Sequence, residues 1–145
     1  EDAKRQICAW KYGGEYDLYN LPAYEEMQVR QIGFMNPQRE KNYYGFWDES
    51  ILVGFVNILE EKEEVFIGIG VNPDLCNKHY GQRMLLITYE ISKKLYPDKP
   101  LYLEVRTWNI RAIKCYQKAG FRIDGQAYEL TTGIGTGTFY RMIRE

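Results

Sequence analysis

LYLEVRTWNIRAIKCYQKAGF, residues 101–121, joins the pattern of a strand to the pattern of a helix. Apolar and polar residues alternate strictly over residues 101–106, which is typical of a half-buried strand and places Glu104 on the polar face. Asn109 then stands where a helix N-cap is expected. The apolar residues after it, Tyr116 among them, recur at helical spacing until a glycine ends the run. The stretch therefore predicts a strand, a tight turn and a helix that present Glu104, Asn109 and Tyr116 from fixed positions.

The composition indicates one ordinary globular domain. The chain has 145 residues, of which 45% are hydrophobic and 27% are charged. A chain of this length buries about two-thirds of its unfolded surface without help from a metal or a disulfide, so we expect a single domain over residues 1–145. The formal net charge of −1 offers no basic field for nucleic acid or an anionic membrane. The longest apolar runs also fall far short of the ~20 residues of a membrane span.

The cysteines favour neither a disulfide framework nor a zinc site. Cys8, Cys76 and Cys115 are odd in number and widely spaced, and the chain contains a single histidine. We therefore expect no metal, and free thiols in a reducing cytoplasm. The same scarcity of histidine argues against Cys115 as a nucleophile.

A second informative strand lies at residues 65–71, followed by a loop and a helix that continues to Pro97. Gly68 and Gly70 share one face of this strand. They either leave space for a close approach by another backbone or a ligand, or mark a bulge. The loop leads into a helix N-terminus, where free N–H groups and the helix dipole favour an anion.

The rest of the chain predicts a mainly antiparallel order of elements. We expect a first strand at residues 6–12, a helix from about Pro22, and then strands at residues 42–47 and 51–59, the latter central and followed by an acidic hairpin turn. After residue 121 we expect strands at residues 122–130 and 138–144. The glycine-rich segment between them lacks the Lys-Ser/Thr ending of a phosphate loop, so it is interpreted as a hairpin.

The pattern N-x-x-A-I-x-x-Y-x-x-x-G-F starts at Asn109 and follows the run LEVR of residues 103–106. It resembles motif B of the GNAT superfamily of N-acetyltransferases. The matching positions are Leu103, Glu104, Val105, Asn109, Ala112, Ile113, Tyr116, Gly120 and Phe121. The resemblance implies an α/β (α+β) fold with a mixed, mostly antiparallel sheet, flanking helices and two central strands that splay apart. The run LEVR resembles the same strand in the ribosomal-protein alanine N-acetyltransferases.

The segment from residue 71 to 86 resembles motif A of the same superfamily, with departures. Counted from Pro73, the Arg/Gln of the family falls on Cys76, its first Gly on His79 and its last Gly or Ala on Gly81. A shifted register would instead put Lys78 at the Arg/Gln position. We favour the first register because it keeps the spacing from Pro73. It places a side chain at His79 where the backbone needs a positive φ, which adds strain.

The resemblance implies acetyl-CoA as the cofactor. Its pantetheine would bond to the backbone of Ile69, Gly70 and Val71, and its pyrophosphate to the loop of Asn77, Lys78, His79, Tyr80, Gly81 and Gln82. Asn109 would contact the pantetheine region, and Tyr116 would lie near the sulfur. Acetyl transfer needs a base for the amine, a donor for the oxyanion and an acid for the leaving thiolate.

The resemblance assigns the acid to Tyr116 and the base to Glu104, with the backbone N–H near Val71 as the oxyanion donor. Glu104 could equally be a surface carboxylate paired with Arg106. We thus expect direct transfer of an acetyl group from acetyl-CoA to a primary amine in a ternary complex. The alternative is an acyl-CoA-binding or regulatory module that has lost turnover, supported by the altered loop at Cys76, Asn77 and His79.

The acceptor is left open by the sequence. Tyrosines are abundant in the parts that bind the acceptor in this fold, and they suit a peptide N-terminus, a polyamine or an aromatic amine, or serve as ordinary packing. These residues are Tyr12, Tyr16, Tyr19, Tyr24, Tyr43, Tyr44, Tyr128 and Tyr140. We expect a small-molecule amine, a protein N-terminus or a lysine as the acceptor, no nucleic acid or membrane, and a monomer or homodimer.

Overall fold

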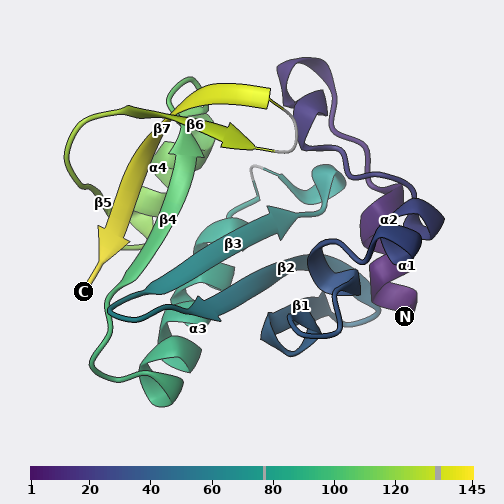
Figure 1. The fold of residues 1–145 in the computed structure, drawn as a ribbon, viewed down its shortest axis with the longest axis horizontal. Helices are drawn as coiled ribbons and strands as arrows, with labels where there is room; N and C mark the ends of the chain where they lie inside the picture. Colours follow the sequence, from purple (N-terminus) through teal and green to yellow (C-terminus); the bar gives the residue numbers. More distant parts are fainter. Residues whose placement is uncertain (77, 133–134) are drawn as a thin grey trace. The chain divides into compact units, whose positions relative to one another are not determined.

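The computed structural model describes residues 1–76, 78–132 and 135–145 (Figure 1). The chain divides into two compact units, of which the first contains Glu1–Asn57 and Ile69–Tyr80 and the second contains Ile58–Gly68 and Gly81–Glu145. The strands β2 (Ile51–Glu60) and β3 (Val65–Val71) run through both units. The strand order is β1-β2-β3-β4-β7-β5, with β6 paired to β7.

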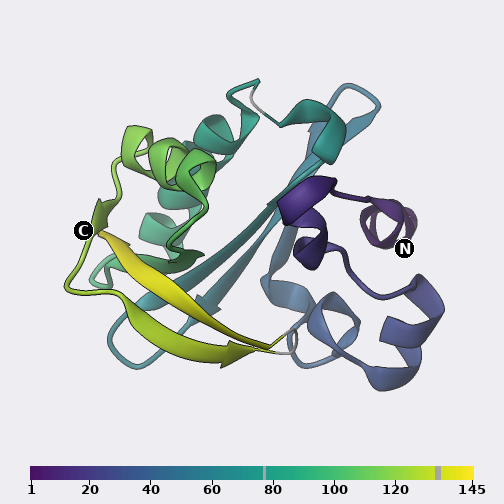
Figure 2. The same ribbon diagram turned by 90° about the horizontal axis from the view of Figure 1, so that it is seen from above.

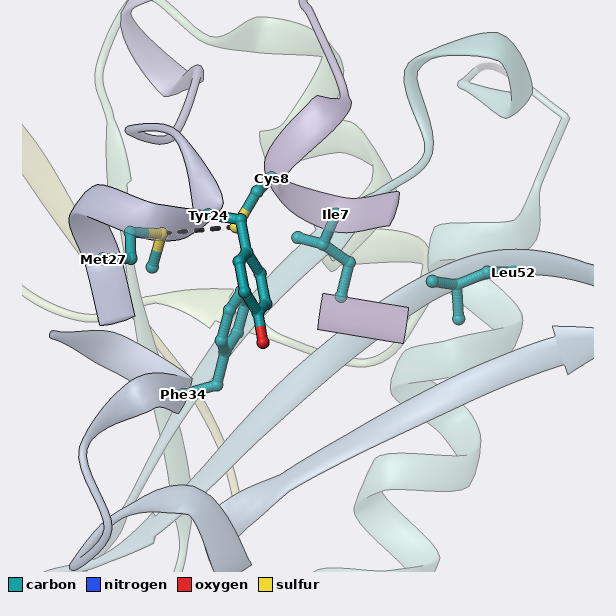
Figure 3. Close-up of a cluster of buried hydrophobic side chains, with 6 residues drawn as sticks. All are labelled: Ile7, Cys8, Tyr24, Met27, Phe34 and Leu52. Atoms are coloured by element: carbon teal, nitrogen blue, oxygen red, sulfur yellow. Dashed lines mark hydrogen bonds between the residues drawn. The ribbon is translucent and has the colours of Figure 1, made fainter. Parts of the chain in front are cut away.

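The first unit is mostly helical. Its elements, in chain order, are α1 (Asp2–Ala9), η1 (Gly14–Tyr19), α2 (Tyr24–Arg30), η2 (Gly33–Met35), η3 (Glu40–Asn42), β1 (Tyr43–Asp48), the first part of β2, the end of β3 and η4 (Pro73–Leu75). β1 pairs antiparallel with β2. Buried side chains from α1, α2, η2 and β2 form a cluster that holds the helices together, shown in Figure 3: Ile7, Cys8, Tyr24, Met27, Phe34 and Leu52.

The predicted strand at residues 6–12 is wrong, because most of it lies in helix α1. The apolar residues Ala3, Ile7 and Trp10 recur at spacings of four and three, and all of them contact or belong to the buried cluster. That spacing is helical, and it forms one apolar stripe on α1. The helix at residue 22 and beyond is confirmed as α2, which begins two residues after the proline.

The second unit is built around β4 (Leu101–Arg106). β4 is parallel to β3 on one side and antiparallel to β7 (Gly135–Arg144) on the other, and β7 also pairs with β5 (Arg122–Ile123) and β6 (Tyr128–Thr132). Among the strand pairs whose register is described, β3–β4 is parallel and the others are antiparallel, which confirms the predicted mixed, mostly antiparallel sheet. In the described residues the β3–β4 ladder covers only two pairs, Val65 with Leu101 and Phe66 with Tyr102.

Helices α3 (Tyr80–Leu95) and α4 (Ile110–Lys118) lie together on one side of the strands of this unit (Figure 2). Leu101, Leu103 and Val105 are buried, whereas Tyr102 and Glu104 are half-buried, so the predicted alternation holds over five residues. Arg106 departs from it, since its side chain is buried.

Both ends of α4 are those predicted from the sequence. The Asn109 side chain accepts a hydrogen bond from the backbone N–H of Ala112 at 3.3 Å, which caps the first turn. Gly120 follows the last turn with φ +98°, a conformation that favours glycine. These two residues define where the helix begins and ends, and so they fix the position of Tyr116 along it.

The single strand predicted at residues 122–130 is two strands, β5 and β6. Gly125, with φ +78°, turns the chain between them, and the backbone N–H of Asp124 bonds to the carbonyl of Arg141. The predicted hairpin after β6 is confirmed by the antiparallel register, in which Thr132 faces Gly135.

Candidate active site

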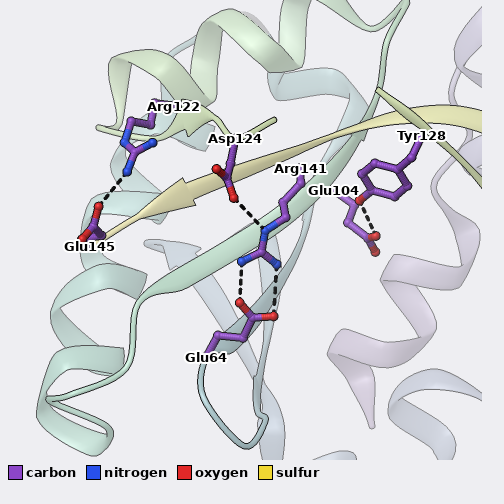
Figure 4. Close-up of polar contacts among 7 residues, drawn as sticks. All are labelled: Glu64, Glu104, Arg122, Asp124, Tyr128, Arg141 and Glu145. Carbon is purple, nitrogen blue, oxygen red and sulfur yellow. Dashed lines mark hydrogen bonds and ion pairs between the residues drawn. The ribbon is translucent and has the colours of Figure 1, made fainter. Parts of the chain in front are cut away.

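Glu104, the predicted base, has a specific partner. The hydroxyl of Tyr128, on β6, donates a hydrogen bond of 2.6 Å to Oε2 of Glu104 (Figure 4). Arg106, the partner considered from the sequence, points elsewhere: its guanidinium carbon lies 4.8 Å from the centroid of the Phe139 ring. Within the described residues Glu104 makes no ion pair. The carboxylate is therefore half-buried and held by a neutral donor.

The arginine opposite Glu104 in the sheet is occupied by other carboxylates. Arg141 is the β7 residue in register with Glu104. Its guanidinium makes a double hydrogen bond to Glu64 and a further contact of 3.3 Å from Nε to Oδ2 of Asp124. The bonds to Glu64 are the main reason why the pKa of Arg141 is raised above its usual value. This cation is thus neutralised by two acids other than Glu104.

Tyr128 is set up as a hydrogen-bond donor. Burial, and after it the hydrogen bond to the Glu104 carboxylate, raise the pKa of Tyr128 well above that of an ordinary phenol. An analogous pair lies two residues earlier on β4, where the Tyr102 hydroxyl donates to Oε1 of Glu61 at 2.7 Å. Burial and that hydrogen bond raise the pKa of Tyr102 in the same way. Both phenols stay protonated at neutral pH.

Helix α4 carries Tyr116, the predicted acid. The side chain is half-buried near the C-terminal end of the helix, one turn after the buried Ile113. The backbone carbonyl of Tyr116 accepts hydrogen bonds from Ala119 and Phe121, which close the end of the helix. Asn109, at the other end, is 7% exposed. Glu104, Asn109 and Tyr116 therefore belong to one strand–turn–helix segment of the second unit.

The predicted pantetheine strand ends in a network of hydrogen bonds within the first unit. The hydroxyl of Tyr12 donates to the backbone carbonyl of Val71 at 2.6 Å. The next residue, Asn72, bonds through its backbone N–H to the carbonyl of Val53 at 2.8 Å and through Nδ2 to that of Leu52 at 3.1 Å. The end of β3, where residues 69–71 are half-buried, is thereby held in place.

Gly70 is required by a neighbouring side chain. A Cβ at this position would lie 2.4 Å from Cε1 and 2.8 Å from Cζ of Phe55 on the adjacent strand β2. The close approach expected on the glycine face of β3 is therefore made by the Phe55 ring. This contact does not involve the backbone N–H and C=O groups of Gly70, because those groups lie in the plane of the sheet.

The predicted phosphate loop has one strained residue. His79 has φ +66°, so the positive φ expected at this position is confirmed. Lys78 and His79 are exposed, and helix α3 begins at the next residue with no acidic side chain in its first turn. Tyr80 donates through its hydroxyl to Asp48 at 2.8 Å. Gly81 is buried and Gln82 half-buried, while Asn77 lies outside the described residues.

Two residues with specific contacts, Tyr12 and Tyr128, were indicated by the sequence only as members of a tyrosine-rich group. Neither has a spacing that links it to Val71 or Glu104. Within the part of the chain that the structure describes, no group of three or more His, Cys, Asp or Glu side chains is arranged to hold a metal ion. No helix among the same residues has both the length and the apolar character needed to cross a membrane.

Comparisons with known proteins identify relatives of the chain. A protein family described as Acetyltransferase (GNAT) family matches residues 6–121. A probable spermine N(1)-acetyltransferase of Bacillus subtilis subsp. natto is 31% identical over 100 residues. That match spans 61% of this chain and 66% of the relative, slightly less than two-thirds of its length.

Solved structures share the fold at low sequence identity. A chimera based on the spermidine N-acetyltransferase of Vibrio cholerae has a TM-score of 0.73 at 16% identity and covers 99% of this chain and 89% of its own. A ribosomal-protein alanine N-acetyltransferase of Escherichia coli has a TM-score of 0.66 at 20% sequence identity, and the match covers 99% of this chain and 85% of that protein. A Bacillus subtilis acetyltransferase in complex with CoA has a TM-score of 0.62 at 19% sequence identity, and the match covers 83% of each chain.

Proposed function

Because the chain belongs to the acetyltransferase (GNAT) family, we propose that it transfers an acetyl group from acetyl-CoA directly to a primary amine within a ternary complex. The observation that carries the proposal is the segment from β4 to α4, in which Glu104, Asn109 and Tyr116 occupy the strand, cap and helix positions of the family motif. We further propose that residues 1–145 form one acetyltransferase domain, since β2 and β3 run through both compact units.

The donor side is supported by features of the backbone. The described β3–β4 ladder ends at Phe66 and Tyr102, three residues before Ile69. Residues 69–71 would bond to the amides of pantetheine as an added strand does. The start of α3, with exposed Lys78 and no acid in its first turn, suits a pyrophosphate.

The conformation of His79 supports the favoured alignment of the phosphate loop. In that register His79 takes the place of the first glycine of the family, and its φ is +66°. A non-glycine residue in this conformation costs on the order of 1–2 kcal/mol. Backbone strain at one residue, at a position where the family uses glycine, is typical of a functional loop.

The proposed chemistry uses three groups of this chain, and acetyl-CoA supplies the activated acetyl thioester. Glu104 accepts the proton of the amine as the nitrogen lone pair forms a bond to the acetyl carbon. The backbone N–H near Val71 donates to the carbonyl oxygen as negative charge develops on it. Tyr116 donates a proton to the sulfur as the carbon–sulfur bond breaks. Tyr116 then regains its proton and Glu104 loses one, so the products are an N-acetyl amine and the CoA thiol.

The first acceptor to test is a polyamine. The support is the relative at 31% identity, which is a probable spermine N(1)-acetyltransferase. A peptide with an N-terminal alanine is the second, since the run LEVR at β4 resembles the ribosomal-protein alanine N-acetyltransferases. Both classes provide the primary amine that the proposed chemistry requires.

A binding module without turnover is the competing function, and the loop supports it through Cys76 and the strained His79. One experiment separates the two. Acetyl-CoA is added to the purified chain with spermine, spermidine or an N-terminal alanine peptide, and the acetylated amine is measured by mass spectrometry. We expect acetyl-CoA to raise the melting temperature and one amine class to be acetylated. If acetyl-CoA stabilises the chain but no amine is acetylated, the result favours a binding module over an enzyme.

A further inference from the structure

Glu104 has one carboxylate oxygen engaged and one that is not. The Tyr128 hydroxyl bonds to Oε2 at 2.6 Å, and in the described residues Oε1 makes no hydrogen bond. We propose that Tyr128 is a positioning residue for Glu104: it holds Oε2 and thereby presents Oε1 to the acceptor amine. This role rests on the proposed function, because it gives Tyr128 a purpose only if Glu104 accepts the proton of the amine.

The sheet fixes the geometry of the pair through β7. Glu104 faces Arg141 on one side of β7, and Tyr128 faces Phe139 on the other. Phe139 and Arg141 are two residues apart, so Tyr128 and Glu104 lie on the same face of the sheet and meet diagonally across β7. Both are half-buried. The contact therefore follows from strand register and does not depend on a loop.

A neutral donor suits a base better than a cation does. An arginine bonded to a carboxylate favours its charged form and so opposes the transfer of a proton to it. Arg141 would be placed for such a pair, but Glu64 and Asp124 bind its guanidinium (Figure 4). Tyr128 restricts the rotation of the Glu104 carboxylate without adding a positive charge. The arrangement therefore orients Glu104 with no cation bound to its carboxylate.

The chain contains a matched control for this hydrogen bond. Tyr102 and Glu61 form the same kind of pair, with a distance of 2.7 Å, half-buried side chains and a phenol that belongs to β4 itself. Glu61 is at the turn after β2 and has no part in the proposed chemistry. Replacing either tyrosine by phenylalanine removes one phenol–carboxylate hydrogen bond and keeps the ring.

The test compares Tyr128→Phe, Tyr102→Phe, Glu104→Gln and the double variant of Tyr128 and Glu104, with the best amine of the panel as substrate. Tyr128→Phe should lower kcat about tenfold or more and leave the KM for acetyl-CoA within about twofold, while Tyr102→Phe keeps kcat within about twofold. The double variant should be no slower than Glu104→Gln, because Tyr128 acts through Glu104. A residue with only a structural role would lower the melting temperature without this dependence on Glu104.

The outcomes that overturn the role are distinct. If the parent acetylates an amine and Tyr128→Phe matches its kcat, the role fails and the proposed function stands. If the losses of the two single variants multiply in the double variant, Tyr128 acts independently of Glu104 and the role also fails. If the parent acetylates no amine, both the role of Tyr128 and the proposed function fail. If Tyr128→Phe does not fold, Glu104→Asp, which withdraws the carboxylate from the hydroxyl, must lose activity; parental kcat in that variant refutes the role.

Discussion

Replacing Gly70 by alanine should destabilise the chain by a mechanism that the structure makes explicit. The added Cβ would lie 2.4 Å from Cε1 of Phe55, whereas ordinary contact begins near 3.4 Å, so the ring has to retreat by about 1 Å. The ring has little freedom to do so. Its centroid is 6.0–6.4 Å from those of three other aromatic rings: Trp10, Phe34 and Tyr43.

The size of the effect follows from two opposing contributions. Overpacking of this kind costs about 3 kcal/mol at the upper end of its usual range. The loss of backbone freedom in the unfolded chain returns about 0.4–1 kcal/mol. The net loss in the free energy of unfolding is therefore about 2 kcal/mol, and for a domain of this size it lowers the melting temperature by roughly 4–8 °C. Shrinking the ring with Phe55→Leu in the same molecule should recover part of the loss.

The assay is thermal unfolding of the parent, Gly70→Ala and a control, Gly45→Ala. Gly45 is also in a strand, but a Cβ there would lie 3.4 Å from Nε1 of Trp47 and 3.6 Å from Cδ1 of Leu52, which are ordinary contacts. The control should unfold at or slightly above the temperature of the parent. A melting temperature of Gly70→Ala equal to that of the parent would show that the space beside Gly70 is open, contrary to the structure.

Three further predictions concern the base, the phosphate loop and the core. Glu104→Gln should lower turnover by ~10²–10⁴-fold with little change in acetyl-CoA affinity, measured by steady-state kinetics and calorimetry; near-parental turnover across pH would leave Glu104 as a structural carboxylate. His79→Gly should release about 1 kcal/mol of strain and bind acetyl-CoA at least as tightly as the parent; a large loss of affinity would mean that the imidazole itself contacts the cofactor. Burial raises the pKa of the Cys8 thiol above its usual 9.0, so the unfolded chain loses this proton first and stability falls as pH rises above about 9. Cys8→Ala should reduce the slope of unfolding free energy against pH between about 9 and 10, and an unchanged slope would refute this assignment.

The segment from β4 to α4 was predictable because its signals are local. A period of two changes to a helical period within a few residues, and Asn109 and Gly120 mark the helix ends with their own conformational preferences. The positive φ of His79 was predictable only through the resemblance to motif A, because the family carries a glycine at the position of His79.

Other features depend on contacts between distant segments. Helix α1 contains Ile7 and Cys8 and is followed by Trp10, residue types that also suit strands, and packing against Tyr24 and Met27 decides in favour of a helix. The bond between Tyr128 and Glu104 requires the registers of both ladders of β7. No local pattern contains either register, so tertiary structure was needed to find this pair.

The rate of acetyl transfer by Tyr116→Phe tests the central claim most directly. The phenylalanine keeps the half-buried ring on α4 and deletes only the hydroxyl, so acetyl-CoA affinity should stay close to that of the parent. The measurement is formation of the acetylated amine at saturating acetyl-CoA by parent and variant. We predict a rate ~10–10³-fold lower for the variant, with acetyl-CoA affinity within a few-fold. A folded variant that binds acetyl-CoA and acetylates the amine at the parental rate would contradict the assignment of Tyr116 as the acid.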